Sequence, residues 1–209
     1  HVPMIWGKDY NPATVTQIAQ SYPGRYWLIW NEPDLGGQAN ITPTRAAQIY
    51  RTLRPLLKGA DPSAKLIVGG VVNLNLNWLT SFRNEYYRLY SEWPAVEGWH
   101  GHLYMGWRDY TIAAWRQKIL TMRDWMAANG GLREFWLTEF GCLTSDVTAT
   151  QIMRDQVPWL ESEVWITRYA WFATYANGPG CDYCTGSLLR PDWAGNGPSS
   201  LGLLYRSLP

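Results

Sequence analysis

The feature that most constrains the fold of this chain is a regular alternation of short apolar runs with longer amphipathic stretches. Six runs rich in β-branched and aromatic residues predict strands at 2–6, 25–30, 65–72, 98–105, 134–140 and 166–175. Stretches of helical length separate them, at 13–21, 42–58, 78–90, 111–128 and 149–162, and a last helical turn is expected at 201–206. Because right-handed crossovers return the chain to the same end of a sheet, this alternation predicts an α/β fold with parallel strands.

Two architectures fit such an alternation, a closed barrel and an open doubly wound sheet. No strand is followed by G-x-G-x-x-G, and G-x-x-x-x-G-K-S/T does not occur. The nucleotide-binding members of this class therefore lose support, which favours the (β/α)8 barrel type. A length of 209 residues supports one substantial core, so we expect a single globular domain over residues 1–209.

Charge and hydropathy exclude several partners. A formal net charge of +1 without blocks of like charge leaves no basic surface for nucleic acid. No apolar run approaches the roughly 20 residues that cross a bilayer, so no membrane partner is expected. The first ten residues carry no basic region followed by an apolar stretch, so no signal peptide is expected in the chain as given, which begins with His1 and is compatible with removal of a leader.

The cysteines bear on the compartment. Cys181 and Cys184 form a C-x-x-C in a Gly/Pro-rich loop, whereas Cys142 stands alone. A zinc site would need a second pair of ligands, and a redox motif would be expected at the start of a helix. We favour a local disulfide between Cys181 and Cys184, which fits an extracellular or secreted protein.

Polar residues gather where three predicted strands end. Asn31 and Glu32 follow the second strand, His102 and Tyr104 lie near the end of the fourth, and Glu139 lies near the end of the fifth. Parallel α/β folds place their sites at these carboxyl ends. A carboxylate in or just after an apolar strand costs free energy unless it is hydrogen-bonded or used, so two of them predict a shared pocket.

The chemistry that needs two such carboxyl groups is cleavage of a glycosidic bond. In the retaining form, one protonates the leaving oxygen while the other attacks the anomeric carbon, with the two about 5–5.5 Å apart. We expect no metal and no other cofactor, because only three histidines are present and this reaction needs none. Glu32 alone is also compatible with a structural acid in a turn, and Glu139 alone with a structural glutamate at a strand end. The prediction of catalysis rests on the two together.

The abundance of tryptophan points to the same substrate class. The chain holds 14 tryptophans and 13 tyrosines, and their flat apolar faces match the C–H faces of sugar rings, although aromatic residues also fill cores. Trp6 and Trp107 lie at or just beyond strand ends and are predicted sugar platforms. The expected partner is an oligo- or polysaccharide.

The motifs also carry a family resemblance along the whole chain. WNEPD after an aromatic strand, HLY, and FWLTEFG about a hundred residues later resemble the clan A glycoside hydrolases, which are (β/α)8 barrels. VPMIWG, NEPDLGGQANITP, WLTSF and WLTEFGC are similar to the Asl-type glycosyl hydrolase catalytic core family, which includes endo-β-1,3-glucanases. The resemblance implies a retaining β-glucanase with Glu32 as acid/base and Glu139 as nucleophile, and Asn31 as a ligand of the substrate 2-hydroxyl.

The resemblance assigns three further residues. Tyr104 matches the aromatic residue beside the nucleophile, His102 is its polar companion, and Trp171 matches the tryptophan beneath the sugar at the cleavage point. Linkage, and endo against exo action, depend on loops that the sequence leaves open. The alternatives are a clan A hydrolase of another linkage specificity and a carbohydrate-binding protein on a decayed barrel.

One departure from the family pattern concerns the first strands. Aligned with the clan, residues 2–6 are barrel strand three, so strands one and two are absent and about six βα units remain. Either the chain is truncated or processed, or the barrel is open and its edges are protected by loops or by a second copy in a homodimer. The clan's strand-two arginine, which commonly lies near the nucleophile, is also absent.

Overall fold

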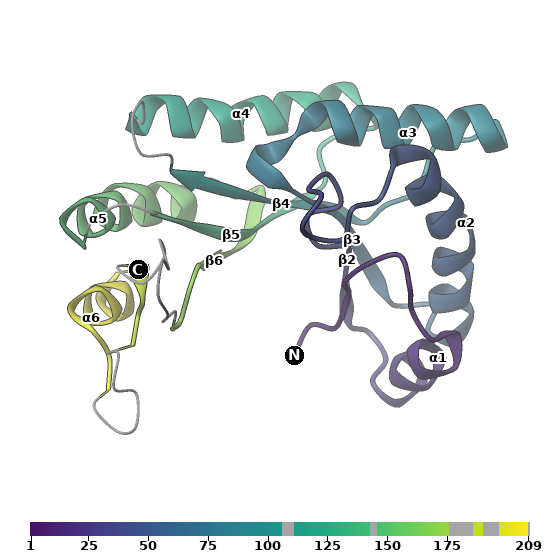
Figure 1. Ribbon diagram of the computed structural model, residues 1–209, viewed down its shortest axis with the longest axis horizontal. Coiled ribbons are helices and arrows are strands. Elements are labelled where there is room, and N and C mark those ends of the chain that lie inside the picture. The colour runs from purple at the N-terminus through teal and green to yellow at the C-terminus, as the bar shows by residue number, and fades with distance from the viewer. Residues whose placement is uncertain (106–110, 143–145, 176–185, 190–196, 209) are drawn as a thin grey trace. The chain divides into compact units, whose positions relative to one another are not determined.

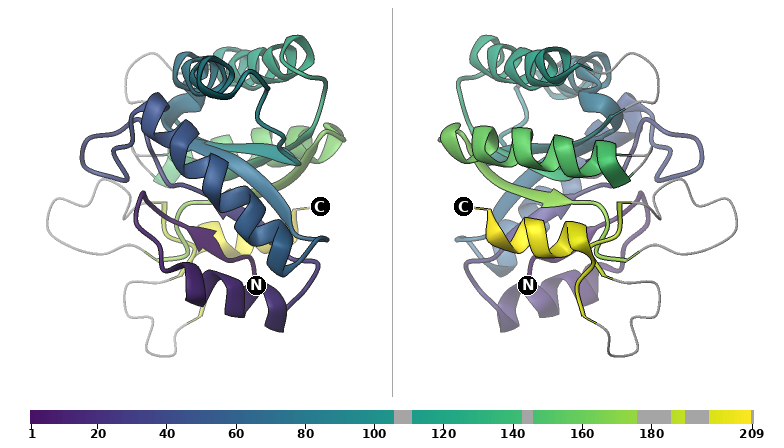
Figure 2. Two further views of the ribbon diagram at one scale, coloured as in Figure 1. Left: turned by 90° about the vertical axis from the view of Figure 1, so that its right-hand side faces the viewer. Right: turned by 90° about the vertical axis from the view of Figure 1, so that its left-hand side faces the viewer.

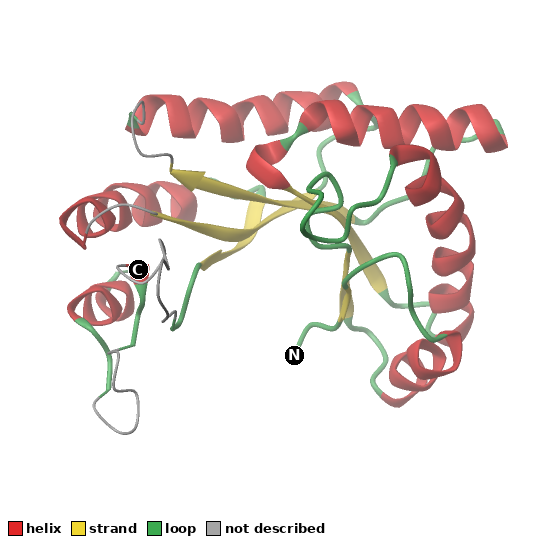
Figure 3. Ribbon diagram, viewed as in Figure 1, coloured by secondary structure: helices red, strands yellow, loops and turns green. Residues whose placement is uncertain are grey.

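A computed structural model describes residues 1–105, 111–142, 146–175, 186–189 and 197–208. Helices and strands alternate along the chain (Figures 1 and 3). The strands are β1 (Met4–Ile5), β2 (Tyr26–Ile29), β3 (Lys65–Val71), β4 (Gly98–Met105), β5 (Glu134–Cys142) and β6 (Ile166–Trp171). The helices are α1 (Pro12–Ser21), α2 (Pro43–Ala60), α3 (Leu76–Tyr90), α4 (Ile112–Ala128), α5 (Asp146–Ser162) and α6 (Ser200–Ser207), with a 3-10 turn at Val72–Leu74.

The six strands form one sheet in the order β1-β2-β3-β4-β5-β6. The pairs β1–β2, β2–β3 and β3–β4 are parallel, and Leu28 lies opposite both Met4 and Ile67. Among the described residues the sheet is open, with β1 and β6 at its edges. The predicted α/β fold with about six βα units is confirmed, whereas protection of the edges by a second copy stays a prediction.

The helix starts follow from local sequence. Asn11 and Thr42 cap α1 and α2 by accepting hydrogen bonds from Thr14 N and Arg45 N, and a proline follows each cap directly. Side-chain oxygens at the cap satisfy amides that have no partner inside the helix, and proline at the first position lacks the donor altogether. These signals place the observed helix starts within three residues of the predicted ones.

The sequence predicts β6 too long. The strand was expected to reach residue 175, but it ends at Trp171. Beyond it, the carbonyl groups of Ala173 and Thr174 accept hydrogen bonds from Leu188 N and Leu189 N. The apolar run is therefore longer than the strand, and its residues 173 and 174 bond to a later segment of the chain.

The chain divides into two compact units, and the expectation of a single domain stays a prediction. The first comprises His1–Gly101 and Gly131–Trp136. Its helices α1 and α2 lie side by side (Figure 2). Its aromatic core centres on Trp30, whose ring meets those of Tyr50, Trp78 and Phe82 edge-on at 5.5–6.3 Å.

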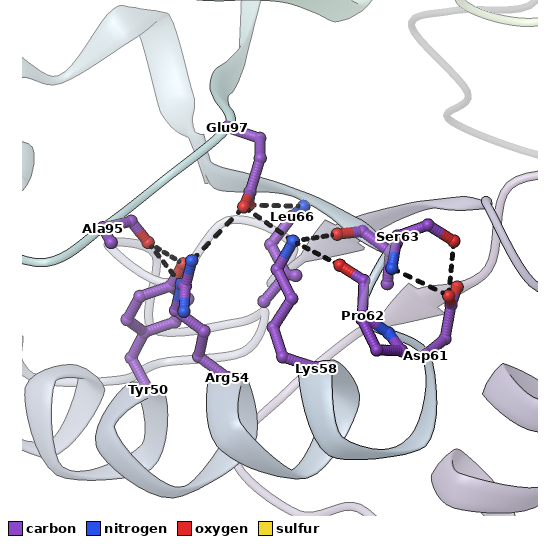
Figure 4. Close-up of polar contacts among 10 residues, drawn as sticks. Tyr50, Arg54, Lys58, Asp61, Pro62, Ser63, Leu66, Ala95 and Glu97 are labelled. Carbon is purple, nitrogen blue, oxygen red and sulfur yellow. Dashed lines mark hydrogen bonds and ion pairs between the residues drawn. The ribbon is translucent and has the colours of Figure 1, made fainter.

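A polar network holds the first unit where β3 and β4 begin (Figure 4). Glu97, just before β4, forms ion pairs with Arg54 at 3.4 Å and Lys58 at 2.9 Å and accepts a hydrogen bond from Leu66 N at 3.0 Å. Asp61 accepts hydrogen bonds from Gly24 N and Ser63 N. In parallel α/β folds this end of the strands serves stability, whereas sites form at the other end.

The second unit comprises His102–Gly130 and the described residues from Leu137 onward. Its helices α5 and α6 lie side by side (Figure 2). The ring of Phe140 packs against those of Trp115 at 6.0 Å and Trp171 at 5.2 Å. No described helix in either unit is both long enough and apolar enough to span a bilayer.

Candidate active site

Glu32 stands three residues beyond the end of β2, on a backbone that is fixed in the first unit. Trp30 N donates to Ile5 O at 2.7 Å, Asn31 N to Trp6 O at 2.9 Å, and Glu32 N to Gly70 O at 2.8 Å. Trp30 has φ 73° and Glu32 has φ 47°, both in the left-handed region that disfavours side chains with a Cβ atom. Such strain persists only where the surroundings enforce it, and it clusters at functional sites.

Two glycines in β3 make room for this backbone. A Cβ atom on Gly70, which has φ +67°, would lie 2.6 Å from Trp30 O and 2.9 Å from the ring of His100. A Cβ atom on Gly69 would lie 2.5 Å from His100 O. Only glycine permits these approaches, so the Gly-Gly pair is part of what positions Glu32.

The loop after Glu32 is held by its own hydrogen bonds and by hydrogen bonds to the turn after β3. Leu35 N donates to Glu32 O, and Ala39 N donates to Asn31 O. Asp34 accepts from Val72 N at 3.0 Å and from Asn75 Nδ2 at 2.8 Å, so this carboxylate secures the loop to the turn after β3. Glu32 itself is buried, with 8% of its surface exposed.

Glu139 lies in β5, in the second unit, and two side chains of β4 contact its carboxylate. Tyr104 OH donates a hydrogen bond to Glu139 Oε2, and His102 Nδ1 lies 3.3 Å from the same oxygen. The His102 side chain is fully buried, whereas that of Glu139 is 24% exposed. The three side chains expected together from the sequence are thus in contact, and a carboxylate held this way has a fixed orientation while it stays accessible.

The wall of this site is formed by the start of the segment after β6. Phe172 N donates to Phe140 O at 2.7 Å, and a Cβ atom on Gly141 would lie 2.6 Å from Phe172 O. The Phe172 ring meets the Tyr104 ring edge-on at 5.8 Å. The glycine of the TEFG motif is therefore required by the close approach of the segment after β6.

The predicted aromatic platforms have different surroundings. Trp171 is 5% exposed, and its Nε1 donates to Gly186 O at 2.7 Å, so its indole belongs to the core of the second unit. Trp6 is 51% exposed in the first unit. Trp107, Cys181 and Cys184 lie outside the described residues.

Sequence reasoning misses four residues. It leaves Asp34 out of the site, places Phe172 inside a longer strand, and treats Gly69 and Gly70 only as part of the strand at 65–72. Two glycines inside an apolar strand signal a close backbone approach, and that signal was present in KLIVGGVV.

Comparison with known proteins places this chain in a family. A family model described as glycosyl hydrolase catalytic core matches residues 1–205. The chain belongs to this glycosyl hydrolase family. The expected family is thereby confirmed, together with the α/β architecture that it implies.

The glycosyl hydrolase is also similar to solved structures. A GH128 subgroup II endo-β-1,3-glucanase from Pseudomonas viridiflava is 26% identical, with a TM-score of 0.76, and the match covers 100% of this chain and 79% of that one. One from Sorangium cellulosum is 25% identical, with a TM-score of 0.75, covering 100% and 80%. A subgroup III curdlan-specific exo-β-1,3-glucanase from Blastomyces gilchristii, 21% identical with a TM-score of 0.75 and covering 99% and 81%, shares the fold. A search of curated proteins found no match.

Proposed function

We propose that this chain is a retaining endo-β-1,3-glucanase in which Glu139 is the nucleophile and Glu32 the acid/base. The observation that carries the proposal is the orientation of the Glu139 carboxylate by Tyr104 OH and His102 Nδ1 at the carboxyl half of β5. A buried glutamate, Glu32, follows another strand of the same sheet. The two structural relatives at 25–26% identity act as endo-β-1,3-glucanases, which supports the substrate class.

The reaction takes two steps. In the first, a Glu139 oxygen bonds to the anomeric carbon as the bond from that carbon to the glycosidic oxygen breaks, and Glu32 gives its proton to the leaving oxygen. In the second, Glu32 takes a proton from water, the water oxygen bonds to the anomeric carbon, and the Glu139 carboxylate leaves. Two inversions give net retention.

The surrounding residues have proposed roles in binding and positioning. Asn31, next to Glu32, is proposed to bind the substrate 2-hydroxyl; its Nδ2 now donates to Gln38 Oε1 at 3.3 Å, which fixes the amide near the loop. Tyr104 and His102 orient the nucleophile. We propose Phe172 as the aromatic wall beside the cleavage point, because it contacts Tyr104 whereas the Trp171 ring is buried.

The experiment compares wild type with Glu32→Gln and Glu139→Gln on β-1,3-, β-1,4- and mixed-linkage glucans, xylan and mannan, following released reducing ends. Glu134→Gln is the matched control, because Glu134 lies at the opposite end of β5 and bonds to Tyr26 OH and Trp136 Nε1. We expect selective cleavage of β-1,3-glucan, abolished by the first two changes and retained by the control.

The stereochemistry is read from the first product. Nuclear magnetic resonance should show the β-anomer before mutarotation, and the α-anomer would overturn the retaining mechanism. Azide should restore turnover of a Glu32→Ala variant on an activated substrate with formation of a β-glycosyl azide; an α-product would exchange the two roles. Glycan binding without any cleavage would show that the chain is a carbohydrate-binding protein and not a hydrolase.

A further inference from the structure

The carbonyl group of Ile29 marks the point at which β2 ends and the chain turns toward Glu32. Ile29 is the last residue of the strand, and the next residue, Trp30, has φ 73°. His100 Nε2 lies 3.1 Å from Ile29 O. Because a carbonyl oxygen only accepts, the ring nitrogen carries the proton and donates the hydrogen bond. A side chain of β4 therefore holds the last carbonyl of β2.

His100 reaches β2 by lying against a glycine of β3. The order of the sheet places β3 between β2 and β4, and a Cβ atom on Gly70 would lie 2.9 Å from His100 Cε1. A side chain at position 70 would therefore push the imidazole away from Ile29 O. The same Gly70 offers its carbonyl oxygen to Glu32 N at 2.8 Å. One imidazole and one glycine thus fix the two ends of the segment 29–32.

The bond matters because of the peptide group to which it belongs. Ile29 O and Trp30 N share one planar peptide group, and rotation of that plane changes φ of Trp30. Trp30 N donates to Ile5 O at 2.7 Å, so both polar groups of this peptide are bonded. Without the donor of His100 the peptide would be free to rotate, and Trp30 would relax from its left-handed φ of 73°. The residues that follow, including Glu32, would move with it.

We propose that His100 is a positioning residue for the acid/base: by fixing the peptide after Ile29, it keeps the Glu32 carboxyl group aligned with the leaving oxygen. The inference rests on the proposed function for the role of Glu32. His100 is fully buried, and burying a polar ring costs free energy that an apolar side chain would not. Whereas His102 contacts the carboxylate of Glu139 directly, His100 acts on Glu32 through the backbone.

The experiment separates the acid from the nucleophile by the leaving group. We would measure kcat/KM on a β-1,3-linked gluco-oligosaccharide, whose leaving oxygen needs a proton, and on a 2,4-dinitrophenyl β-glycoside of a β-1,3-linked glucobiose, whose leaving group departs without one. A displaced acid lowers the first value and spares the second. Loss of folded protein lowers both equally, so the ratio of the second value to the first is insensitive to a merely structural defect.

Three substitutions of His100 test the bond. His100→Asn has an amide too short to reach Ile29 O, and His100→Leu has no donor; both should raise the ratio about 10- to 100-fold. His100→Gln places a donor at the reach of Nε2, so its ratio should stay close to that of wild type.

Two further variants serve as controls. Tyr50→Phe is the matched control, because it removes another buried side-chain donor to a backbone carbonyl, Ala95 O at 2.7 Å, just before β4 begins (Figure 4). Its ratio should equal that of wild type. Glu32→Gln, which removes the acid itself, should raise the ratio most.

The outcomes separate this inference from the proposed function. A raised ratio for Glu32→Gln, with an unchanged ratio for whichever of His100→Asn and His100→Leu folds, overturns the inference and leaves the acid/base in place. The inference is also overturned if His100→Gln raises the ratio as much as His100→Asn, or if neither His100→Asn nor His100→Leu folds, since His100 would then serve packing. An unchanged ratio for Glu32→Gln, or a wild type that cleaves neither substrate, refutes the proposed function itself, and the inference falls with it.

Discussion

Replacing Gly70 with alanine should cost stability and displace Glu32 at the same time. The methyl group would lie 2.6 Å from Trp30 O and 2.9 Å from the His100 ring, on a residue whose φ is +67°. A left-handed conformation costs an alanine about 1–2 kcal/mol, and forcing a group into a filled core costs about 1–3 kcal/mol. We therefore expect Gly70→Ala to lower the free energy of unfolding by about 2–5 kcal/mol.

The assay is urea unfolding followed by tryptophan fluorescence, with Gly59→Ala as the matched control. Gly59 lies inside α2, where an added Cβ atom meets nothing within 4 Å. The same methyl group should stabilise the helix there by about 0.5–1 kcal/mol. Because Gly70 O accepts the hydrogen bond of Glu32 N, kcat/KM of folded Gly70→Ala should also fall, by up to about 100-fold. Equal unfolding midpoints for the two variants would refute the reasoning.

Two further predictions concern the same unit. Asp34→Ala should lower the free energy of unfolding by about 1–3 kcal/mol, because two donors lose the carboxylate that they bond; Asp34→Asn, which keeps one acceptor oxygen, should lose less in the same urea assay. Hydrogen bonds from Arg88 and then Thr44 lower the pKa of Glu85 from 4.5 to about 2. The stability that this carboxylate contributes is thus complete above pH 4.5 and lost as the pH falls towards 2. The difference in urea midpoint between wild type and Arg88→Gln should shrink over that window; a constant difference would show that the pair does not titrate as described.

The strands and helices were predictable because their signals are local. The caps at Asn11 and Thr42, each followed by proline, are written in adjacent residues, and the apolar runs of β3 and β5 have the composition of buried parallel strands. The end of β6 was not predictable in the same way. It depends on hydrogen bonds from Leu188 and Leu189, a segment distant in sequence.

The candidate site likewise has features that the sequence predicts and features that depend on tertiary packing. Contact between Glu139 and the pair His102 and Tyr104 was predictable, because neighbouring parallel strands bring their carboxyl ends together. The exposure of an indole side chain was not predictable, because it depends on tertiary packing. Nothing near Trp171 in sequence shows that its Nε1 bonds to Gly186 O, or that Phe172 takes the place beside Tyr104.

The strained backbone at Trp30 and Glu32 explains why β1, β2 and β3 must cooperate for the acid/base to be placed. Each of the three amides after β2 bonds to a carbonyl of a neighbouring strand or its extension, from Ile5, Trp6 and Gly70. These bonds offset two left-handed residues that would otherwise relax. The Trp6 carbonyl accepts the hydrogen bond of Asn31 N, while the Trp6 side chain is half-exposed. The backbone of the short segment after β1 therefore fixes the residue next to Glu32.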